Sequence, residues 1–270
     1  MADPQSITRL FVISDMHREM RRGRPEGPWP SVDVVILAGD IDNGAAGVTW
    51  AGTLALDLQV PVLYVPGNHE YYGHEFDSLR ASLREAAAAW PGLHLLDDDE
   101  LVVGGVRFLG TTLWTDYRAW PGDVWLNQEV ARKEISDHRI IRRGGRLFTP
   151  DDALVLHKAA RRFVEMRLAR PFAGPTVVVT HHGPSLLCRH PLYPSGPLGA
   201  AFYSDLSALM LRYAPALWVF GHTHVPLDAS VGTTRLYSNP RGYPGEAVPV
   251  PDHFDRSGIV EVLADTRTIS

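Results

Sequence analysis

The chain holds one cysteine, Cys188, so no disulfide bond can form within it. This near absence of cysteine favours a reducing compartment, and we expect a cytoplasmic location. Long apolar runs are also missing. None approaches the roughly 20 residues that span a membrane, so we expect no membrane association. Residues 1–6 contain no basic segment leading into an apolar one, and we therefore expect no secretory signal.

An excess of positive charge is missing as well. The chain carries 26 Lys and Arg residues against 31 Asp and Glu residues, a formal net charge of −5 at pH 7. This balance provides no general attraction to nucleic acid or to anionic membranes. The composition that remains, 45% hydrophobic and 21% charged, is ordinary for a soluble globular protein. No repeat, low-complexity tract or linker divides the 270 residues, and we predict one domain over residues 1–270.

Short apolar runs alternate with amphipathic segments, and this pattern predicts an α/β protein. Gly104 and Gly105 lie between two apolar runs and predict a hairpin. Thr149 and Pro150, followed by acidic residues, predict the start of a helix. The predicted strands cover 7–14, 32–38, 60–65, 101–103, 106–109 with a continuation over 111–114, 176–180, 216–220, 233–238 and 258–263. The predicted helices cover 44–58, 74–90, 150–170 and 204–213.

Residues 116–149 and 186–201 show no regular pattern, and we predict that they form irregular inserts near the active site. The first insert contains the basic run 138–146. A solvated charged surface is the better interpretation of that run than a rim that holds a second phosphate. Similarly, Trp114 and Trp120 fit packing of the insert better than stacking on a nucleobase.

Polar side chains that are able to bind metal follow five of the predicted strands. They are Asp15 and His17, Asp40, Asn68 and His69, His181 or His182, and His222 and His224. In open α/β sheets, ligands bind at the carboxyl ends of the strands. The sequence therefore predicts that these side chains meet in one site.

The residue types indicate a metal site. In an extended segment, residues two apart face the same side, so Asp15 with His17 is expected to hold one ion, and His222 with His224 likewise. Asp, Asn and His suit Mn²⁺, Fe or Zn²⁺, whereas the absence of thiolates from these motifs argues against a Cys-type structural zinc site. Seven such groups are too many for one ion with an open position, and they fit two ions that share a carboxylate. Each cluster alone also fits a cap or a surface turn, and it is their ordered conjunction that favours metal binding.

This ordered set resembles the calcineurin-like metallophosphoesterases, whose pattern is complete here. The motifs are Asp15-Met16-His17, Gly39-Asp40, Gly67-Asn68-His69-Glu70, Thr180-His181-His182 and Gly221-His222-Thr223-His224. They extend over residues 15–224, most of the chain. The resemblance implies a four-layer α/β/β/α sandwich with two mixed sheets and a metal site at the C-terminal ends of the strands.

The resemblance also implies a role for each motif residue. The implied ligands are Asp15, His17 and His224 for one ion, Asn68, His181 and His222 for the other, and Asp40 as the bridge between them. His69 would be catalytic without being a ligand. His181 is favoured over His182 because it directly follows the strand, as the family ligand does.

The implied activity is hydrolysis of a phosphate ester, with a small phosphodiester or phosphomonoester as substrate. Two divalent ions, Mn²⁺ first and Fe or Zn²⁺ as alternatives, would generate a bridging hydroxide that attacks phosphorus in line with the leaving group. His69 would protonate the departing oxygen or stabilise its charge. Asp42 and Glu70 are candidates for fixing the tautomer of an imidazole.

Two other functions remain as alternatives. A nuclease would act on polynucleotides, and the net negative charge weighs against it, although bound metals supply local positive charge. A catalytically inactive scaffold with this fold would be expected to lose ligands or the catalytic histidine, and this chain keeps them all. Among other residues, His157 fits a core histidine better than a catalyst. Arg241 either returns toward the metals or belongs to an ordinary turn.

Overall fold

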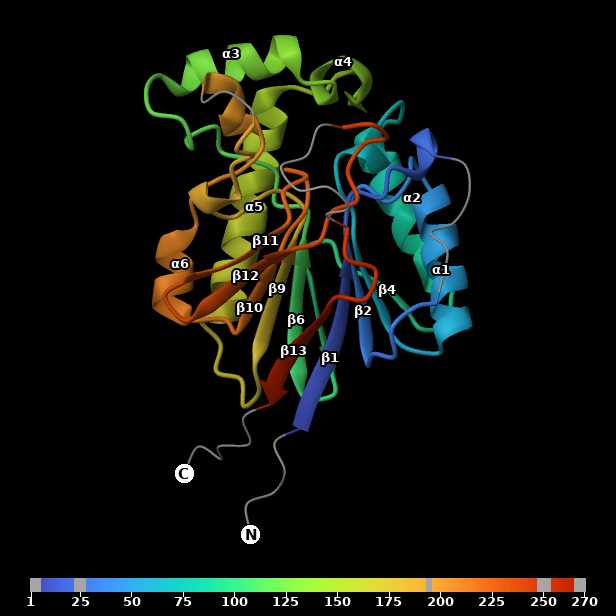
Figure 1. Ribbon diagram of the computed structural model, residues 1–270. Coiled ribbons are helices and arrows are strands. Elements are labelled where there is room, and N and C mark those ends of the chain that lie inside the picture. The colour runs from blue at the N-terminus through green and yellow to red at the C-terminus, as the bar shows by residue number, and fades with distance from the viewer. Residues whose placement is uncertain (1–5, 22–27, 193–195, 247–253, 265–270) are drawn as a thin grey trace.

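The computed structural model describes residues 6–21, 28–192, 196–246 and 254–264. Two large sheets pack face to face in the centre of the molecule, and helices cover their outer faces (Figure 1). Three of the residues in the second predicted insert, 193–195, lie outside the described part of the chain.

The first sheet has the strand order β13-β1-β2-β3-β4. Strands β1 to β4 run parallel to one another, and β13 pairs antiparallel with β1 at the edge. Their bounds are β1 (Ser6–Ile13), β2 (Val34–Ala38), β3 (Val62–Val65), β4 (Leu93–Leu95) and β13 (Ile259–Ala264).

The second sheet has the order β11-β12-β10-β9-β6-β5. The four inner strands are parallel, and the two edge strands pair antiparallel with their neighbours. Their bounds are β5 (Asp99–Val103), β6 (Val106–Thr111), β9 (Thr176–Thr180), β10 (Leu217–Val219), β11 (Leu227–Val231) and β12 (Thr234–Ser238).

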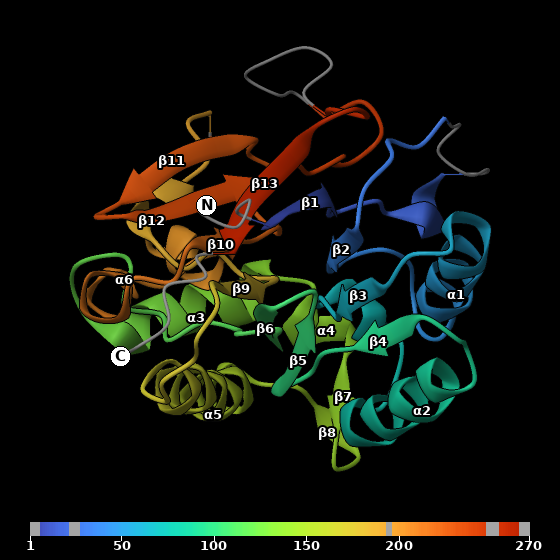
Figure 2. The ribbon, with the colours of Figure 1, turned by 90° about the horizontal axis from the view of Figure 1, so that it is seen from below.

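The helices complete a four-layer arrangement. Helices α1 (Ala46–Leu58) and α2 (Phe76–Ala88) lie against the first sheet, and α5 (Pro150–Leu168) and α6 (Ser207–Tyr213) lie against the second (Figure 2). The Thr149 side chain accepts a hydrogen bond from Asp152 N at the predicted start of α5. The α/β/β/α sandwich with two mixed sheets is therefore confirmed.

Alternation along the strands divides the core into layers. In β1, Leu10 and Val12 face the second sheet, while Phe11 and Ile13 face α1 and α2. In β2 every residue is buried, because one face meets the other sheet and the other face meets helices. Both sheets contribute buried aliphatic side chains to the layer between them. The burial of this apolar surface therefore holds the two sheets together.

Sequence patterns were insufficient in four places. The strand predicted over 111–114 ends at Thr111, because Leu113 and Trp114 adopt positive φ angles of 71° and 52°. Strands β4 and β11 were not predicted. The stretch 116–149, predicted to be irregular, contains α3 (Val124–Glu134), α4 (Asp137–Ile140), β7 (Arg142–Arg143) and β8 (Arg146–Leu147).

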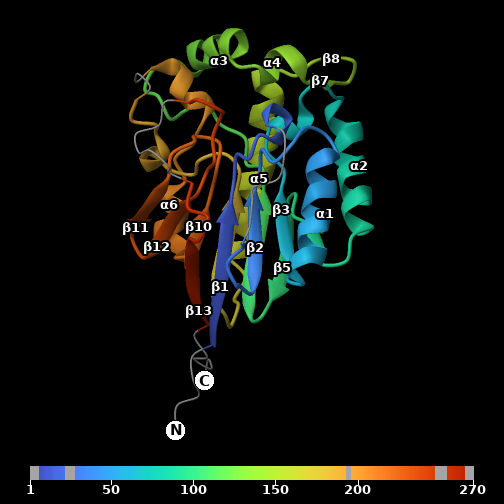
Figure 3. The same cartoon turned by 45° about the vertical axis from the view of Figure 1, so that its right-hand side comes forward.

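The carboxyl ends of the parallel strands point toward one end of the molecule, and α3 and α4 lie at that end (Figure 3). Short 3-10 turns lie there as well: η1 (Arg18–Met20), η2 (His69–Tyr71), η3 (Leu186–Cys188) and η4 (Pro197–Ala201). Among the described residues, no helix combines the length and the apolar character needed to cross a membrane.

Candidate metal centre

The loops that leave β1, β2, β3, β9 and β10 bring the predicted residues together at the carboxyl end of the sheets. The extended backbone assumed for the Asp-x-His and His-x-His pairs does not occur, because Asp15, His17, His222 and His224 all have positive φ. His224 groups with Asp15 and His17, whereas His222 groups with Asp40 and His181. The two histidines therefore lie in different groups, which favours the assignment implied by the resemblance, one histidine for each ion.

The first group joins the loops after β1 and β10. His17 Nε2 lies 3.0 Å from His224 Nε2, and His224 Nε2 lies 3.4 Å from Asp15 Oδ1. All three side chains are buried. Two imidazole nitrogens that face each other beside a carboxylate form a suitable set of donors for a divalent cation.

The second group is built around His181. Its Nε2 lies 3.2 Å from Asp40 Oδ1 and 3.0 Å from Asn68 Oδ1. His222 offers a ring nitrogen to the same group as Asp40 and His181. The Asn68 amide is oriented from behind, because its Nδ2 donates to Asp137 Oδ1 at 2.9 Å and leaves Oδ1 facing the site.

Asp40 connects the groups. Its Oδ2 lies 3.9 Å from both His17 Nε2 and His69 Nε2, while its Oδ1 faces His181. The Asp40 carboxylate lies so close to the backbone of Gly67 that only glycine fits at that position, because a Cβ on residue 67 would overlap the carboxylate. Asp40 therefore lies between the two groups, with one carboxylate oxygen toward His17 and the other toward His181.

An unpaired carboxylate oxygen is a further sign that these residues suit a metal ion. Asp15 Oδ2 is buried and has no hydrogen-bond partner among the described residues. An uncompensated buried carboxylate oxygen is costly, and a cation is the partner that would satisfy it.

Carboxylates outside the groups fix the imidazole tautomers, and sequence reasoning missed them. Glu19 Oε1 accepts from Nδ1 of His17 at 3.1 Å and of His69 at 2.9 Å. Glu246 Oε2 accepts from His224 Nδ1 at 2.6 Å. An Nδ1–H donated outward leaves the Nε2 lone pair for the centre. These acids follow no strand-end motif, and their role emerges only from the folded loops.

Glu70 has a different task from the predicted one. Its carboxylate accepts from the backbone N–H groups of Gly67, Asp40 and Ile41 and from the Tyr64 hydroxyl, at 2.6–3.1 Å. It ties the loop after β2 to the loop after β3. Asp42 lies 3.6 Å from the Arg18 guanidinium. The carboxylates that contact the imidazoles are therefore those of Glu19 and Glu246, and not those of Asp42 or Glu70 as predicted.

Substituting Glu70→Gln tests this loop connection. The amide keeps the shape but presents N–H₂ toward backbone N–H donors, so at least one buried donor loses its acceptor. We expect a loss of about 1–3 kcal/mol in the free energy of unfolding, measured by denaturant titration. Glu85→Gln, on the exposed face of α2, is the control. Equal stability of Glu70→Gln and wild type would contradict this role.

The electrostatics of the site favour charged carboxylates. Burial disfavours ionisation of Asp40, but the neighbouring imidazoles of His181 and His69 outweigh it and hold its pKa well below the usual range. Burial likewise opposes protonation of the imidazoles, yet Asp40 raises the pKa of His181 to about 9. Asp15 and Glu246 overcome burial to raise the pKa of His224 to about 10. Protons and metal ions therefore compete for the same nitrogens.

Tyr243 is a further residue that the sequence did not single out. Its hydroxyl lies 3.0 Å from His69 Nε2, and its ring centroid lies 4.3 Å from that of His17. The turn over 239–246 does return to the site, as considered for Arg241, because Arg241 N donates to Ser14 O at 3.0 Å. The side chain that reaches the centre from this turn is Tyr243.

Other candidates lie outside the centre. His182 Nδ1 contacts Thr112 O at 3.3 Å, and its ring stacks beside His222. His157 is buried on α5 with its Nδ1 3.2 Å from Leu113 O, as in a core histidine. In the basic run, Arg146 pairs with Asp152 at 2.6 Å.

Fold and site together define the class of protein. The family model for calcineurin-like phosphoesterases matches residues 8–226. The chain belongs to this family, which confirms the resemblance, and it is a metal-dependent phosphoester hydrolase.

Two curated relatives and one solved structure refine the comparison. The chain is 25% identical over 268 residues to the [acyl-carrier-protein] phosphodiesterase PptH of Mycobacterium tuberculosis, covering 88% of this chain and 78% of that protein. It is 25% identical over 201 residues to uncharacterized protein L509 of Acanthamoeba polyphaga mimivirus, covering 68% and 69% respectively. The crystal structure of the phosphopantetheinyl hydrolase PptH from M. tuberculosis aligns with a TM-score of 0.69 at 21% identity, over 87% of this chain and 89% of that one.

Proposed function

We propose that this enzyme hydrolyses a phosphodiester with two divalent metal ions. The proposed ligands are Asp15, His17 and His224 for one ion, Asn68, His181 and His222 for the other, and Asp40 for both. The observation that carries the proposal is that the Asp15/His17/His224 group and the Asp40/His181/His222 group are joined by a third group, which consists of His17, Asp40 and His69. Overlapping groups with buried carboxylates support adjacent sites rather than one isolated site. Mn²⁺ is the proposed ion, with Fe or Zn²⁺ as alternatives.

Bound divalent ions would supply an activated hydroxide and would neutralise charge on the phosphate. The residues of the chain perform the remaining tasks. His69 is the proposed proton donor to the leaving oxygen. Burial opposes its protonation, but Asp40 and Glu19 raise its pKa, which favours the protonated form that a proton donor needs. Glu19 orients the ring through Nδ1, and Nε2 faces Asp40 and Tyr243.

A diester is preferred over a monoester because the relative PptH is named as a phosphodiesterase. That name also makes a substrate joined to a carrier protein a candidate beside a small free ester. A polynucleotide is not favoured, since the chain has a net charge of −5. A single domain over residues 1–270 and a cytoplasmic location stay predictions from the sequence.

The activity is tested with the full chain, stripped of metal by a chelator and then supplied with Mn²⁺, Fe²⁺ or Zn²⁺. The substrates are bis-p-nitrophenyl phosphate, p-nitrophenyl phosphate and a single-stranded oligonucleotide. We expect metal-dependent turnover, fastest with the diester. Faster hydrolysis of the monoester would overturn the diester preference, and cleavage of the oligonucleotide alone would support the nuclease.

Metal addition should also stabilise the fold, because the ions bind the assembled groups and not the unfolded chain. At a Mn²⁺ concentration 100-fold above its dissociation constant, one site contributes about 2.7 kcal/mol. For a chain of this size we expect Tm to rise by roughly 5–10 °C in a thermal unfolding scan. NaCl at equal ionic strength is the control. An unchanged Tm across the Mn²⁺ titration would count against a built metal site.

A further inference from the structure

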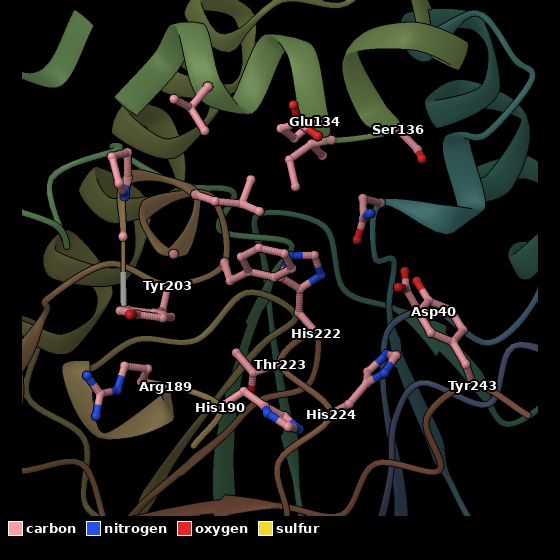
Figure 4. Close-up of a pocket in the computed structure, with 18 of the residues that line it drawn as sticks. Asp40, Glu134, Ser136, Arg189, His190, Tyr203, His222, Thr223, His224 and Tyr243 are labelled. Carbon is pink, nitrogen blue, oxygen red and sulfur yellow. The ribbon is translucent and has the colours of Figure 1, made fainter. Parts of the chain in front are cut away.

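A cavity of about 510 Å³ opens beside the metal centre and continues to the two inserts, which carry α3 and η4. Its volume falls within the range of about 300–1,000 Å³ that is typical of small-molecule sites. Asp40, His222 and His224 line one part of it, and Glu134 and Ser136 lie across it at the end of α3 (Figure 4). The cavity is therefore continuous with the place where a scissile phosphate would bind.

The wall formed by the inserts is apolar. Val130 and Ile135, at the end of α3, face the cavity together with Leu198 from η4 and Phe202 just after it. All four side chains are only half-buried. Apolar surface that is left accessible inside a cavity gains free energy when an apolar ligand covers it.

The apolar wall is physically connected to the metal centre. The Phe202 ring stacks on His222 with a centroid distance of 5.1 Å and an interplanar angle of 29°. The segment that carries Phe202 is held by Thr115, whose hydroxyl donates to Ala200 O at 2.6 Å. A group attached to a phosphate at the metals would thus extend directly along Phe202 toward Leu198.

We propose that this cavity binds an elongated, uncharged and largely apolar substituent of the scissile phosphate. This inference rests on the proposed phosphodiesterase function and names its substrate class. Among the described residues, the Asp, Glu, Lys and Arg side chains that line the cavity are Asp40 and Glu246 at the centre, and Glu134 and Arg189, of opposite charge, on the side of the inserts. A polyanionic substituent would find no net positive charge there, and a planar nucleobase would leave much of the apolar wall uncovered.

Binding is measured first, so that the test does not depend on turnover. Methyl phosphate, hexyl phosphate and uridine 5′-monophosphate are titrated calorimetrically into the Mn²⁺-loaded protein. At about twofold or more for each buried methylene, the five additional methylenes should make hexyl phosphate bind roughly 30-fold more tightly than methyl phosphate. Equal affinities of the two alkyl phosphates, or tighter binding of the nucleotide than of hexyl phosphate, would overturn the proposal.

Two variants locate the effect. Leu198→Asn places a polar amide on the wall and should reduce the hexyl-to-methyl ratio at least fivefold. Leu198→Trp fills the cavity and should reduce the ratio in the same direction. Leu126→Asn is the matched control, because Leu126 is exposed on α3 and is not among the cavity residues. A ratio that is unchanged in both Leu198 variants would contradict the assignment.

Turnover of p-nitrophenyl methyl phosphate and p-nitrophenyl hexyl phosphate separates the two claims. In both reactions water adds to phosphorus and the bond to the nitrophenyl oxygen breaks, so the alkyl group stays on the phosphate. Faster hydrolysis of the hexyl ester supports the cavity assignment. Equal hydrolysis of both esters refutes this inference alone, whereas hydrolysis of neither, with tight hexyl phosphate binding, refutes the proposed function alone.

Discussion

Asp40→Ala is expected to lose both metal ions and to reduce phosphodiester hydrolysis to background. Asp40 is buried, and its carboxylate lies within 3.9 Å of ring nitrogens of His17, His69 and His181. Without Asp40, each of the two ions would lose a negatively charged ligand. A water molecule in its place is neutral and does not supply that charge. Metal content by plasma mass spectrometry and turnover of bis-p-nitrophenyl phosphate are the two readouts.

Asp42→Ala is the matched control for that experiment. It removes a carboxylate two residues away that lies near Arg18, 3.6 Å from the guanidinium, rather than in the His/Asp groups. We expect this variant to keep two ions and most of its activity. Since Asp40 also accepts from His69 N at 2.9 Å, a thermal unfolding scan must show that the Asp40 variant is folded. A folded Asp40→Ala protein with two bound ions and normal turnover would eliminate the bridging role.

His69→Ala is expected to separate metal binding from catalysis. His69 approaches Asp40, but it lies outside the sets of residues proposed to hold the two ions. Metal content, measured as for Asp40, should therefore stay near that of wild type, while turnover of a dialkyl phosphate falls by about 10²–10⁴-fold. Release of the alcohol measures that turnover.

The loss of activity in the His69→Ala variant should depend on the leaving group of the substrate. Nitrophenolate leaves without protonation, whereas an alkyl alcohol needs a proton from His69. The loss of activity should be larger for a dialkyl phosphate than for bis-p-nitrophenyl phosphate. His94→Ala, which removes a half-buried histidine of β4, serves as the control. Loss of both ions from His69→Ala would make His69 a ligand and would contradict its assignment as a proton donor.

The architecture could be predicted largely from local patterns. The aliphatic run of β2 is buried on both faces, and Thr149 does cap α5 as its position before Pro150 indicated. Both features depend on interactions close in sequence or on simple burial, which a pattern records directly. Helix α3 was missed because Trp125 and Leu126 are 64% and 48% exposed, so its apolar residues do not mark one buried face.

The convergence of the motif residues was predictable from the sequence, but their geometry was not. The motifs identified which side chains converge, and the loops do bring Asp15, Asp40 and His181 together. His222 and His224 adopt left-handed backbone conformations, and their rings belong to different groups. The spacing of two residues does not indicate this, because the rule assumes an extended backbone.

The supporting groups could not be predicted for a related reason. Glu19, Asp137 and Glu246 lie on short turns or on the insert, and each acts by contacting a residue far away in the chain. Such contacts depend on the path of whole loops rather than on a local motif. Tyr243 belongs to the same class of residue, because its contact with His69 spans 174 positions.

Anomalous X-ray diffraction from crystals of the full chain grown with Mn²⁺ tests the central claim most directly. Data collected on the two sides of the manganese absorption edge locate the ions without assumptions about the ligands. We predict two anomalous peaks about 3.5–4 Å apart, with the Asp40 carboxylate between them. One peak, or two peaks without Asp40 in contact with both, would contradict the dinuclear centre on which the proposed function rests.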